Sequence, residues 1–453
     1  MFWVILRKIL IIMKTHILYF WIATLGGMLF GYDTAVINGA MPFFTSYFNL
    51  SDAMVGWSVS SGLVGCILGA SFASWPADRL GRRDSMKIAA LLFLASALGT
   101  GFAYNFTMFI IARILGGIAV GAVSVIMPIY LSEITPAKHR GSSTINFQLG
   151  VVVGILAAFF VDYLLIDTGE YNWRYMFLSM ALPSLFFFTF LLQAKRSPRW
   201  LIQRGYISEA NIALLEYNSQ ENSIKLVREI QASLHKQNNK QDCLSLFKKP
   251  YLRFMLIGIA VGIFSQLSGI AIVMYYATDI FRAAGFSTNA AIGQTVIIGI
   301  TNLAFTLLAK SLIDKVGRRK LLLFGTAGMS VTLAVLAASY FSTGFPAWVL
   351  LMALVSFVAL FASSMGAVSW VLLGEIFPNN IRSQGMSIGS LSNWIVNGSI
   401  SFLFPIATGA LPNGGGYCFA FFAITTLTGY FFFKKYLFET TNKSLEEIEL
   451  ENS

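Results

Sequence analysis

The chain has 453 residues, of which 56% are hydrophobic and only 12% are charged. A soluble protein of this length could not bury so much apolar surface, so the composition excludes a water-soluble enzyme or binding domain. A formal net charge of +11 would suggest a nucleic-acid partner in a soluble protein. In a membrane protein, basic residues instead gather in the cytoplasmic loops, so we expect the lipid bilayer and no nucleic acid as partner.

Residues 1–16 are interpreted as an N-terminal extension, because Arg7 and Lys8 interrupt an otherwise apolar stretch and no cleavage site follows. This extension is either an interfacial helix or an upstream addition, with Met13 as the native start. The three cysteines and three histidines show no disulfide framework and no metal-ligand spacing. No nucleophile–base constellation occurs in the sequence, so we expect no catalytic residue, cofactor or metal.

Twelve apolar stretches are each long enough to cross a hydrocarbon core of about 30 Å as a helix. They lie at residues 17–38, 54–76, 86–104, 107–130, 144–165, 174–193, 253–276, 290–313, 320–341, 347–373, 384–408 and 416–437. The sequence therefore predicts an all-α membrane protein with twelve transmembrane helices.

The distribution of basic residues predicts the orientation of these helices. If both termini lie in the cytoplasm, Arg174 and Arg282 are the only basic residues in the predicted loops on the opposite side of the membrane. This distribution follows the positive-inside rule. The polar segment 194–252 lies on the cytoplasmic side and is expected to form a linker with short helices. Ser208 is a candidate N-cap for the first of these helices, and a second is expected near 222–236. The linker separates two bundles, at 17–193 and 253–437, and a cytoplasmic tail follows at 438–453.

The two halves of the sequence repeat two loop motifs. DRLGRR at 78–83 recurs as DKVGRR at 314–319, between the second and third helices of each half. EITP at 133–136 recurs as EIFP at 375–378, after the fourth helix of each half. These repeats predict two six-helix, pseudo-symmetric halves around a central pathway.

Two charged residues fall inside predicted membrane helices. Asp33 and Arg113 each lie a few residues from the predicted outer end of a helix, which places them at similar depth. An unpaired charge at such depth costs several kcal/mol, so pairing or a wet cavity is expected. The alternative is two unrelated residues that water reaches near the membrane surface.

Ten short strings in this order resemble the sugar porters of the major facilitator superfamily, from the first helix to the tail. They are GYDTAVING (31–39), DRLGRR (78–83), Arg113-x-x-x-Gly117, EITPAKHRG (133–141), NFQLGVVVG (146–154), SPRWL (197–201), QLSGI with YY (266–276), DKVGRR (314–319), WVLLGEIFPNNIRS (370–383) and ETTNKSLEEIE (439–449). The resemblance implies the fold of that superfamily, a multi-pass location in the cell membrane, and transport by alternating access.

Proton-coupled members of this family carry Asp at the position of Asp33, so the resemblance implies import of a monosaccharide, hexose or pentose, together with protons by a functional monomer. An arginine beside the carboxylate keeps it ionised, and a proton binds when that contact loosens. Three alternatives stay open: a facilitator in which Asp33 is structural, a polyol or inositol–proton symporter, and a sugar sensor. The short tail disfavours a sensor, and the polar cavity disfavours a drug exporter.

The resemblance also implies roles for two groups of residues. A cytoplasmic latch of salt bridges would hold the outward-open state. Its residues are Asp78, Arg82, Glu133, Arg140, Asp314, Arg318, Glu375 and Arg382. The substrate would meet amides and aromatic walls in the central cavity. These residues are Phe30, Gln148, Gln266, Tyr275, Asn302, Trp370, Asn393 and Trp394.

Several positions depart from the family pattern. Ser265 and Ala271 stand where the family has Gln and Asn, so two sugar-binding amides are missing and the substrate specificity is open. Ile155 replaces a second Gln of the xylose symporters, which favours the glucose-transporting members. Arg196 stands where the family has Glu, so we expect like charges to meet there unless another contact compensates.

Overall fold

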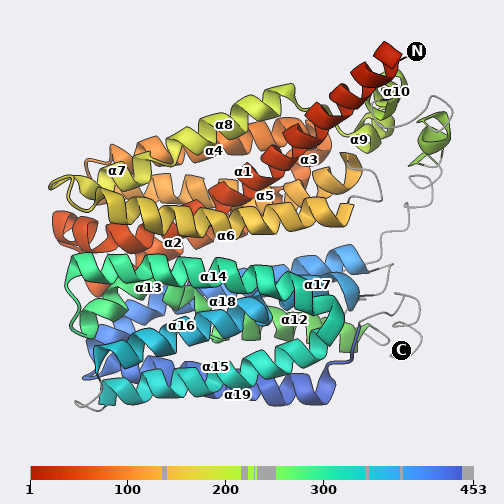
Figure 1. Cartoon of the computed structure of the whole chain (residues 1–453). Coiled ribbons are helices and arrows are strands. Elements are labelled where there is room, and N and C mark those ends of the chain that lie inside the picture. Colours follow the sequence, from red (N-terminus) through yellow and green to blue (C-terminus); the bar gives the residue numbers. More distant parts are fainter. Residues whose placement is uncertain are drawn as a thin grey trace. The chain divides into compact units, whose positions relative to one another are not determined.

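The computed structural model describes residues 2–134, 140–215, 223–228, 230–231, 251–341, 346–377 and 381–440, with side chains left undescribed at 1–16, 140–145, 314, 347, 382 and 383. Within these ranges every regular element is a helix and no strand occurs (Figure 1).

The first half of the chain folds into ten described helices. They are α1 Phe2–Phe48, α2 Asp52–Phe72, α3 Ser74–Arg79, α4 Arg82–Gly101, α5 Phe106–Ile134, α6 Arg140–Leu165, α7 Asn172–Leu178, α8 Ala181–Gln193, α9 Pro198–Gln203 and α10 Ile207–Leu215. The second half continues with α12 Leu252–Leu267, α13 Ile270–Ala283, α14 Thr288–Val316, α15 Arg318–Phe341, α16 Ala347–Ser363, α17 Met365–Glu375, α18 Arg382–Ala410 and α19 Gly414–Tyr436.

Each predicted span coincides largely with one helix or with two consecutive helices. In the described part of the chain, ten helical segments are long and apolar enough to cross a membrane. The predicted spans that correspond to α4 and α18 are not among these ten. The first turns of α4 carry several charges, and α18 contains many Ser and Asn residues. Twelve spans with both termini in the cytoplasm therefore stay a prediction.

Two predicted boundaries are wrong. Helix α1 continues through Pro42 to Phe48, well past the predicted end at 38, so Asp33 lies deeper in its helix than expected. Neighbouring helices in a membrane protein can satisfy the backbone groups that a proline leaves free. Ser208 lies inside α10 rather than at its N-cap. The cap in this region is Ser197, whose hydroxyl accepts a hydrogen bond from Trp200 N at 3.2 Å and begins α9.

The chain divides into two compact units. Unit 1 comprises Met1–Thr34, Val64–Ala158 and Arg174–Lys240, and unit 2 comprises Ala35–Leu63, Phe159–Trp173 and Gln241–Ser453. Unit 2 therefore contains two segments from the first half of the sequence, which come from α1 and α2 and from the end of α6. The expected division into bundles at 17–193 and 253–437, with the linker and tail, stays a prediction.

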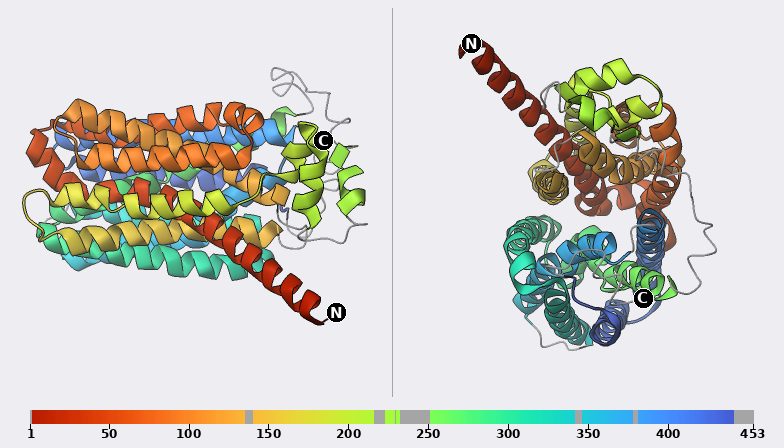
Figure 2. Two further views of the ribbon diagram at one scale, coloured as in Figure 1. Left: turned by 90° about the horizontal axis from the view of Figure 1, so that it is seen from above. Right: turned by 90° about the vertical axis from the view of Figure 1, so that its right-hand side faces the viewer.

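Within each unit the helices pack in close pairs. In unit 1, α4 packs against α5 and α8, and in unit 2, α15 packs against α19 and α12 against α18 (Figure 1). A side chain at Gly415 or Gly416 of α19 would collide with Tyr340 or Phe341 of α15, so glycine permits this approach. Figure 2 shows the first turns of α1 extending away from the other helices of unit 1.

Candidate functional site

The charged pair of unit 1 joins α1 to α5. Arg113 Nη1 lies 3.2 Å from Asp33 Oδ1 and also donates a hydrogen bond to the Asp33 backbone carbonyl at 3.1 Å. The two residues are only 2% and 3% exposed. The guanidinium lies over the ring of Phe177, with 5.8 Å between Cζ and the ring centroid. The structure thus brings together the two residues that depth matching predicted to pair.

Small residues allow the helices to approach closely around this pair. A Cβ added at Gly116 of α5 would lie 2.8 Å from Asp33 Oδ1 and 2.5 Å from Ser96 Oγ of α4. A Cβ at Gly31, two residues before Asp33, would collide with the backbone of Val151 in α6. The Asp33 carboxylate is therefore held on α1 between tightly packed neighbours, with Arg113 as its counter-charge.

A second buried carboxyl group, which the sequence analysis missed, lies in α6. Asp162 is 0% exposed, and among the described residues its side-chain oxygens have no side-chain partner, while the backbone N–H of Gly39 faces the carboxyl group. Its carboxylate lies against Gly39 of α1, where an added Cβ would be 2.5 Å from Asp162 Oδ2. The available signal was a single acidic residue inside the apolar stretch that precedes Tyr163.

The predicted amides of unit 2 form a small network between α12 and α18. Gln266 Nε2 donates to Asn393 Oδ1 at 3.2 Å, and Asn393 Nδ2 donates to the Gly262 carbonyl at 3.3 Å. Gln266 Oε1 is buried and has no hydrogen-bond partner among the described residues. Gly269, with φ of +82°, separates α12 from α13 directly after this site, a conformation that glycine adopts without strain.

A polar stripe along α18 extends this network. Asn397 lies one turn after Asn393, and its Nδ2 contacts the Tyr275 hydroxyl of α13 at 3.5 Å. Ser401 follows one turn later and donates to Asn397 Oδ1 at 3.2 Å. The sequence analysis missed Asn397 and Ser401, although their spacing of four residues from Asn393 places all three on one helix face.

The remaining predicted substrate residues lie in separate environments. Asn302 and Trp394 of unit 2 are buried, whereas Trp370 is 44% exposed. Phe30 and Gln148 belong to unit 1 and are half-buried, and the ring of Phe30 lies 6.4 Å from that of Phe147. Their contact with a substrate stays a prediction.

The predicted latch residues of unit 1 meet around Arg82. Its guanidinium lies 3.1 Å from Asp78 Oδ1 and 3.1 Å from Glu133 Oε2. Trp200 of α9 closes this turn, because its Nε1 donates to the Asp78 carbonyl at 2.9 Å and its ring covers Gly81. The side chain of Arg140, the fourth predicted member, lies outside the described residues.

Unit 2 arranges the repeated motif with a different partner. Arg318 Nη2 lies 3.2 Å from Glu375 Oε1, which matches the Arg82–Glu133 contact of unit 1. Glu439 accepts hydrogen bonds from the backbone N–H groups of Arg318 and Arg319 at 2.9 and 3.2 Å, so it caps α15. The side chains of Asp314 and Arg382 lie outside the described residues.

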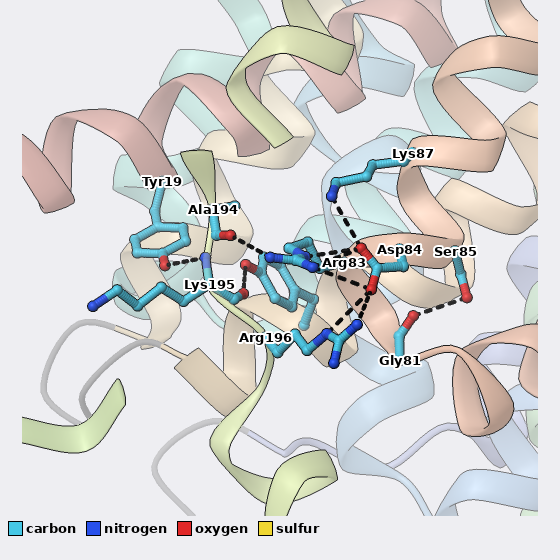
Figure 3. Close-up of polar contacts among 10 residues, drawn as sticks. Tyr19, Gly81, Arg83, Asp84, Ser85, Lys87, Ala194, Lys195 and Arg196 are labelled. Carbon is cyan, nitrogen blue, oxygen red and sulfur yellow. Dashed lines mark hydrogen bonds and ion pairs between the residues drawn. The ribbon is translucent and has the colours of Figure 1, made fainter. Parts of the chain in front are cut away.

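Arg196 does not face only like charge. Its guanidinium lies 3.1 Å from Asp84 Oδ2, and the same carboxylate contacts Arg83 at 2.9 Å and Lys87 at 3.0 Å (Figure 3). Burial works to raise the pKa of Asp84, but the Lys87 hydrogen bond and the neighbouring cations outweigh it and lower this pKa. Asp84 is therefore the compensating contact for the family's missing glutamate.

Comparison with known proteins identifies the family. The model of the sugar (and other) transporter family matches residues 19–451. The D-xylose-proton symporter of Escherichia coli (strain K12) is 36% identical, with 94% of each chain covered. The D-xylose transporter of Levilactobacillus brevis is 38% identical, with 96% of this chain and 95% of the relative covered.

Solved structures give the same result. An inward-open conformation of the xylose transporter XylE from E. coli has a TM-score of 0.84 at 33% identity, covering 96% of this chain and 99% of the other. The same symporter bound to 6-bromo-6-deoxy-D-glucose has a TM-score of 0.80 at 34% identity, covering 97% and 99%. The chain is a multi-pass protein of the cell membrane and belongs to the sugar transporter family of the major facilitator superfamily.

Proposed function

We propose that the protein imports a monosaccharide together with protons by alternating access, with Asp33 as the proton-binding group. The observation that supports this most directly is the buried ion pair between Asp33 and Arg113. Relatives that are 35% to 36% identical are named as xylose-proton and arabinose-proton symporters, which supports a pentose as the cargo.

Arg113 sets the proton affinity of Asp33. While the guanidinium lies within 3.2 Å, its charge stabilises the ionised carboxylate. When the helices move and this contact lengthens, burial favours the neutral acid, and a proton from water adds to a carboxylate oxygen. Closure of the contact expels that proton. Alternating movement of α1 against α5 therefore links proton binding to the access state.

The amides of α12 and α18 are proposed to bind the sugar. Gln266 Oε1 is a buried acceptor without a partner among the described residues, and a sugar hydroxyl would satisfy it. Ser265 and Ala271 are both buried, so the amides that the family carries there are replaced by small side chains. Fewer hydrogen bonds are then available from this side of the site.

A polyol is the second candidate substrate. The major myo-inositol transporter of Bacillus subtilis (strain 168) is 35% identical over 94% of this chain. The replacement of two family amides by Ser265 and Ala271 fits a different hydroxyl pattern, because each amide would otherwise define the position of one hydroxyl.

Uptake into proteoliposomes tests the proposal. Labelled D-xylose, L-arabinose, D-glucose and myo-inositol are offered with an inward proton gradient, without one, and with a protonophore. We expect at least one monosaccharide to accumulate only when the gradient is present. Gln266→Ala should weaken the apparent affinity for that sugar by about tenfold, because a buried sugar hydroxyl left without its hydrogen-bond partner costs about 1–3 kcal/mol. Equal uptake of every transported sugar with and without the gradient would show a facilitator instead.

A further inference from the structure

Asp162 lies where the first half of the chain contacts the second half inside unit 2. It is fully buried on α6 against Gly39 of α1. The residue before Gly39, Asn38, accepts a hydrogen bond through Oδ1 from the backbone N–H of Thr278 in α13 at 2.9 Å. The short α1 segment Asn38–Gly39 therefore contacts α6 and α13 at once.

This region contains further buried polar atoms without partners. Asn38 Nδ2 and Thr278 Oγ1 are both buried, and neither forms a hydrogen bond within the described residues. One amide donor and one hydroxyl group are thus unsatisfied near the α1–α13 contact, and the Asp162 carboxyl group beside them has no side-chain partner. Such a concentration is unusual, because buried polar groups are nearly always hydrogen-bonded.

The same unit contains a set of contacts that we call the outer contact, because the predicted topology places it on the outer side. It joins α1 to α13 through the Asn38–Thr278 hydrogen bond, and also joins α2 to α18 and α6 to α14. A Cβ at Gly56 would collide with the Phe402 carbonyl, and a Cβ at Gly293 would touch the Tyr163 ring at 3.3 Å. Asn289 donates to Asp167 at 3.4 Å. Asp162 belongs to the helix that forms part of this contact.

None of the charged groups near Asp162 neutralises it. In the segment after α6, Asp167 accepts a hydrogen bond from Asn289, and on α13, Asp279 pairs with Arg282 at 3.3 Å. The α1 residue against it is a glycine. The other described titratable side chains of α6 and α13 are tyrosines, at 163, 275 and 276. On α1, Asp33 pairs with Arg113, and the remaining described groups are tyrosines, at 19, 32 and 47. Among the described residues no cation forms an ion pair with Asp162. Its ionised form has no counter-charge, and an unpaired charge is costly at this depth, so a closed outer contact favours the protonated acid.

We propose that Asp162 is a second proton-binding site, which stabilises the closed outer contact when protonated and opens it when ionised. A proton from the external water adds to a carboxylate oxygen while α1 and α13 are apart, and the neutral group is then buried by their approach. Loss of that proton creates a charge that requires water, so α13 must withdraw. Because the proton leaves to the side from which it came, it does not contribute to the transport stoichiometry.

The proposal goes beyond sugar–proton coupling and rests on the proposed function only in assuming alternating access. Asp33 would couple a proton to movement of the cargo, whereas Asp162 would make the access state respond to external pH. The two carboxyl groups can therefore be tested separately.

The test measures the accessibility of the outer contact with a single introduced cysteine. Ser60 of α2 is buried, and it lies one turn from Gly56, which contacts α18. Ser60→Cys is placed in a chain whose cysteines at 66, 243 and 418 are replaced by Ala, and is treated in proteoliposomes with an external membrane-impermeant maleimide. Tyr104→Cys, at a position that is 77% exposed, corrects for the pH dependence of the reagent.

We expect the corrected labelling rate at position 60 to fall by about tenfold from alkaline to acidic external medium, which corresponds to about 1.4 kcal/mol in the opening equilibrium. In Asp162→Asn, a nearly isosteric mimic of the protonated acid, the rate should be low and independent of pH. Asp162→Ala provides a second variant in which the pH dependence should also be lost. A wild-type pH response in both variants, or no response in the parent, would overturn the proposal.

Asp33→Asn separates this proposal from the coupling proposal. In that variant the pH dependence of labelling at position 60 should persist while proton-driven accumulation is lost. If accumulation persists instead, the coupling proposal fails and the labelling result still decides the role of Asp162.

Discussion

Two buried carboxyl groups on neighbouring helices differ in one respect. Asp33 on α1 and Asp162 on α6 are 2% and 0% exposed, and each lies against a glycine of another helix, Gly116 and Gly39 respectively. Asp33 has Arg113 at 3.2 Å, whereas Asp162 has no ion-pair or side-chain hydrogen-bond partner among the described residues and faces only the backbone N–H of Gly39 there. The two carboxyl groups are therefore equally buried but differ in whether a cation compensates their negative charge.

The partner determines which protonation state the closed structure favours. A buried carboxylate with an arginine in contact can stay ionised, because attraction offsets the lost hydration. A buried carboxyl group without such a partner is favoured as the neutral acid. A carboxyl group whose charge depends on a movable arginine can couple proton binding to sugar transport. A carboxyl group whose charge depends on access of water can control whether the outer contact opens.

Removal of Arg113 would leave Asp33, like Asp162, as a buried carboxyl group without a cation beside it. Arg113→Leu should lower the free energy of unfolding by about 3–5 kcal/mol at neutral pH, because it leaves a buried charge without its partner. It should also abolish proton-driven sugar accumulation. Thermal unfolding in detergent and uptake into proteoliposomes measure the two effects. The double variant Asp33→Asn/Arg113→Leu should regain most of the stability and none of the accumulation; unchanged stability of Arg113→Leu would contradict this account.

The two glycines provide a matched pair of substitutions. Gly39→Ala places a Cβ 2.5 Å from Asp162 Oδ2, and Gly116→Ala places one 2.8 Å from Asp33 Oδ1. Each should lower thermal stability by about 1–3 kcal/mol through overpacking. Gly116→Ala should also reduce proton-driven accumulation, because it displaces Asp33 from Arg113, whereas Gly39→Ala should retain accumulation. Equal effects of both variants on accumulation would remove the functional distinction between the two carboxyl groups.

Asp84 extends the comparison to a carboxylate that contacts three cations outside the membrane-spanning part. A double-mutant cycle of Asp84→Asn and Arg196→Gln should give a coupling energy of about 0.2–1 kcal/mol at neutral pH, because the pair is partly exposed. The folded structure lowers the pKa of Asp84, so this stabilisation is present above its ordinary pKa and is lost as pH falls through the lowered one. Thermal unfolding of the four proteins at neutral and strongly acidic pH measures it. A coupling energy that persists when Asp84 is protonated would exclude this ion pair as its source.

The apolar stretches, the repeated loop motifs and the membrane depth of charged residues predicted much of the fold and part of the candidate site. The apolar stretches anticipated the helices, because a membrane-spanning helix requires about 20 apolar residues. The Asp33–Arg113 pair was predicted because isolated charges are costly in lipid, although Asp33 lies deeper in its helix than the predicted boundary implied. The resemblance to the sugar porters placed Arg82, Glu133, Arg318 and Glu375 in one set of salt bridges, but it did not give the individual Arg82–Glu133 and Arg318–Glu375 contacts.

The sequence did not predict contacts that depend on which face a helix turns toward its neighbours or on the residue at which a helix ends. Asp162 resembled any polar residue in an apolar stretch, because its lack of a side-chain partner is a property of packing. The contact of Arg196 with Asp84 depends on the course of the non-helical segment between α8 and α9, and sequence spacing does not give that course. The end of α1 was missed because Gly39 and Pro42 suggest a break, whereas the neighbouring helices stabilise a continuous helix.

Sugar exchange and proton-driven accumulation by Asp33→Asn, measured in the same proteoliposomes, test the central claim most directly. The account predicts that the variant exchanges internal for external sugar at a rate similar to that of the parent but shows no accumulation under an inward proton gradient. Accumulation by Asp33→Asn to the parent level would contradict the assignment of Asp33 as the coupling residue.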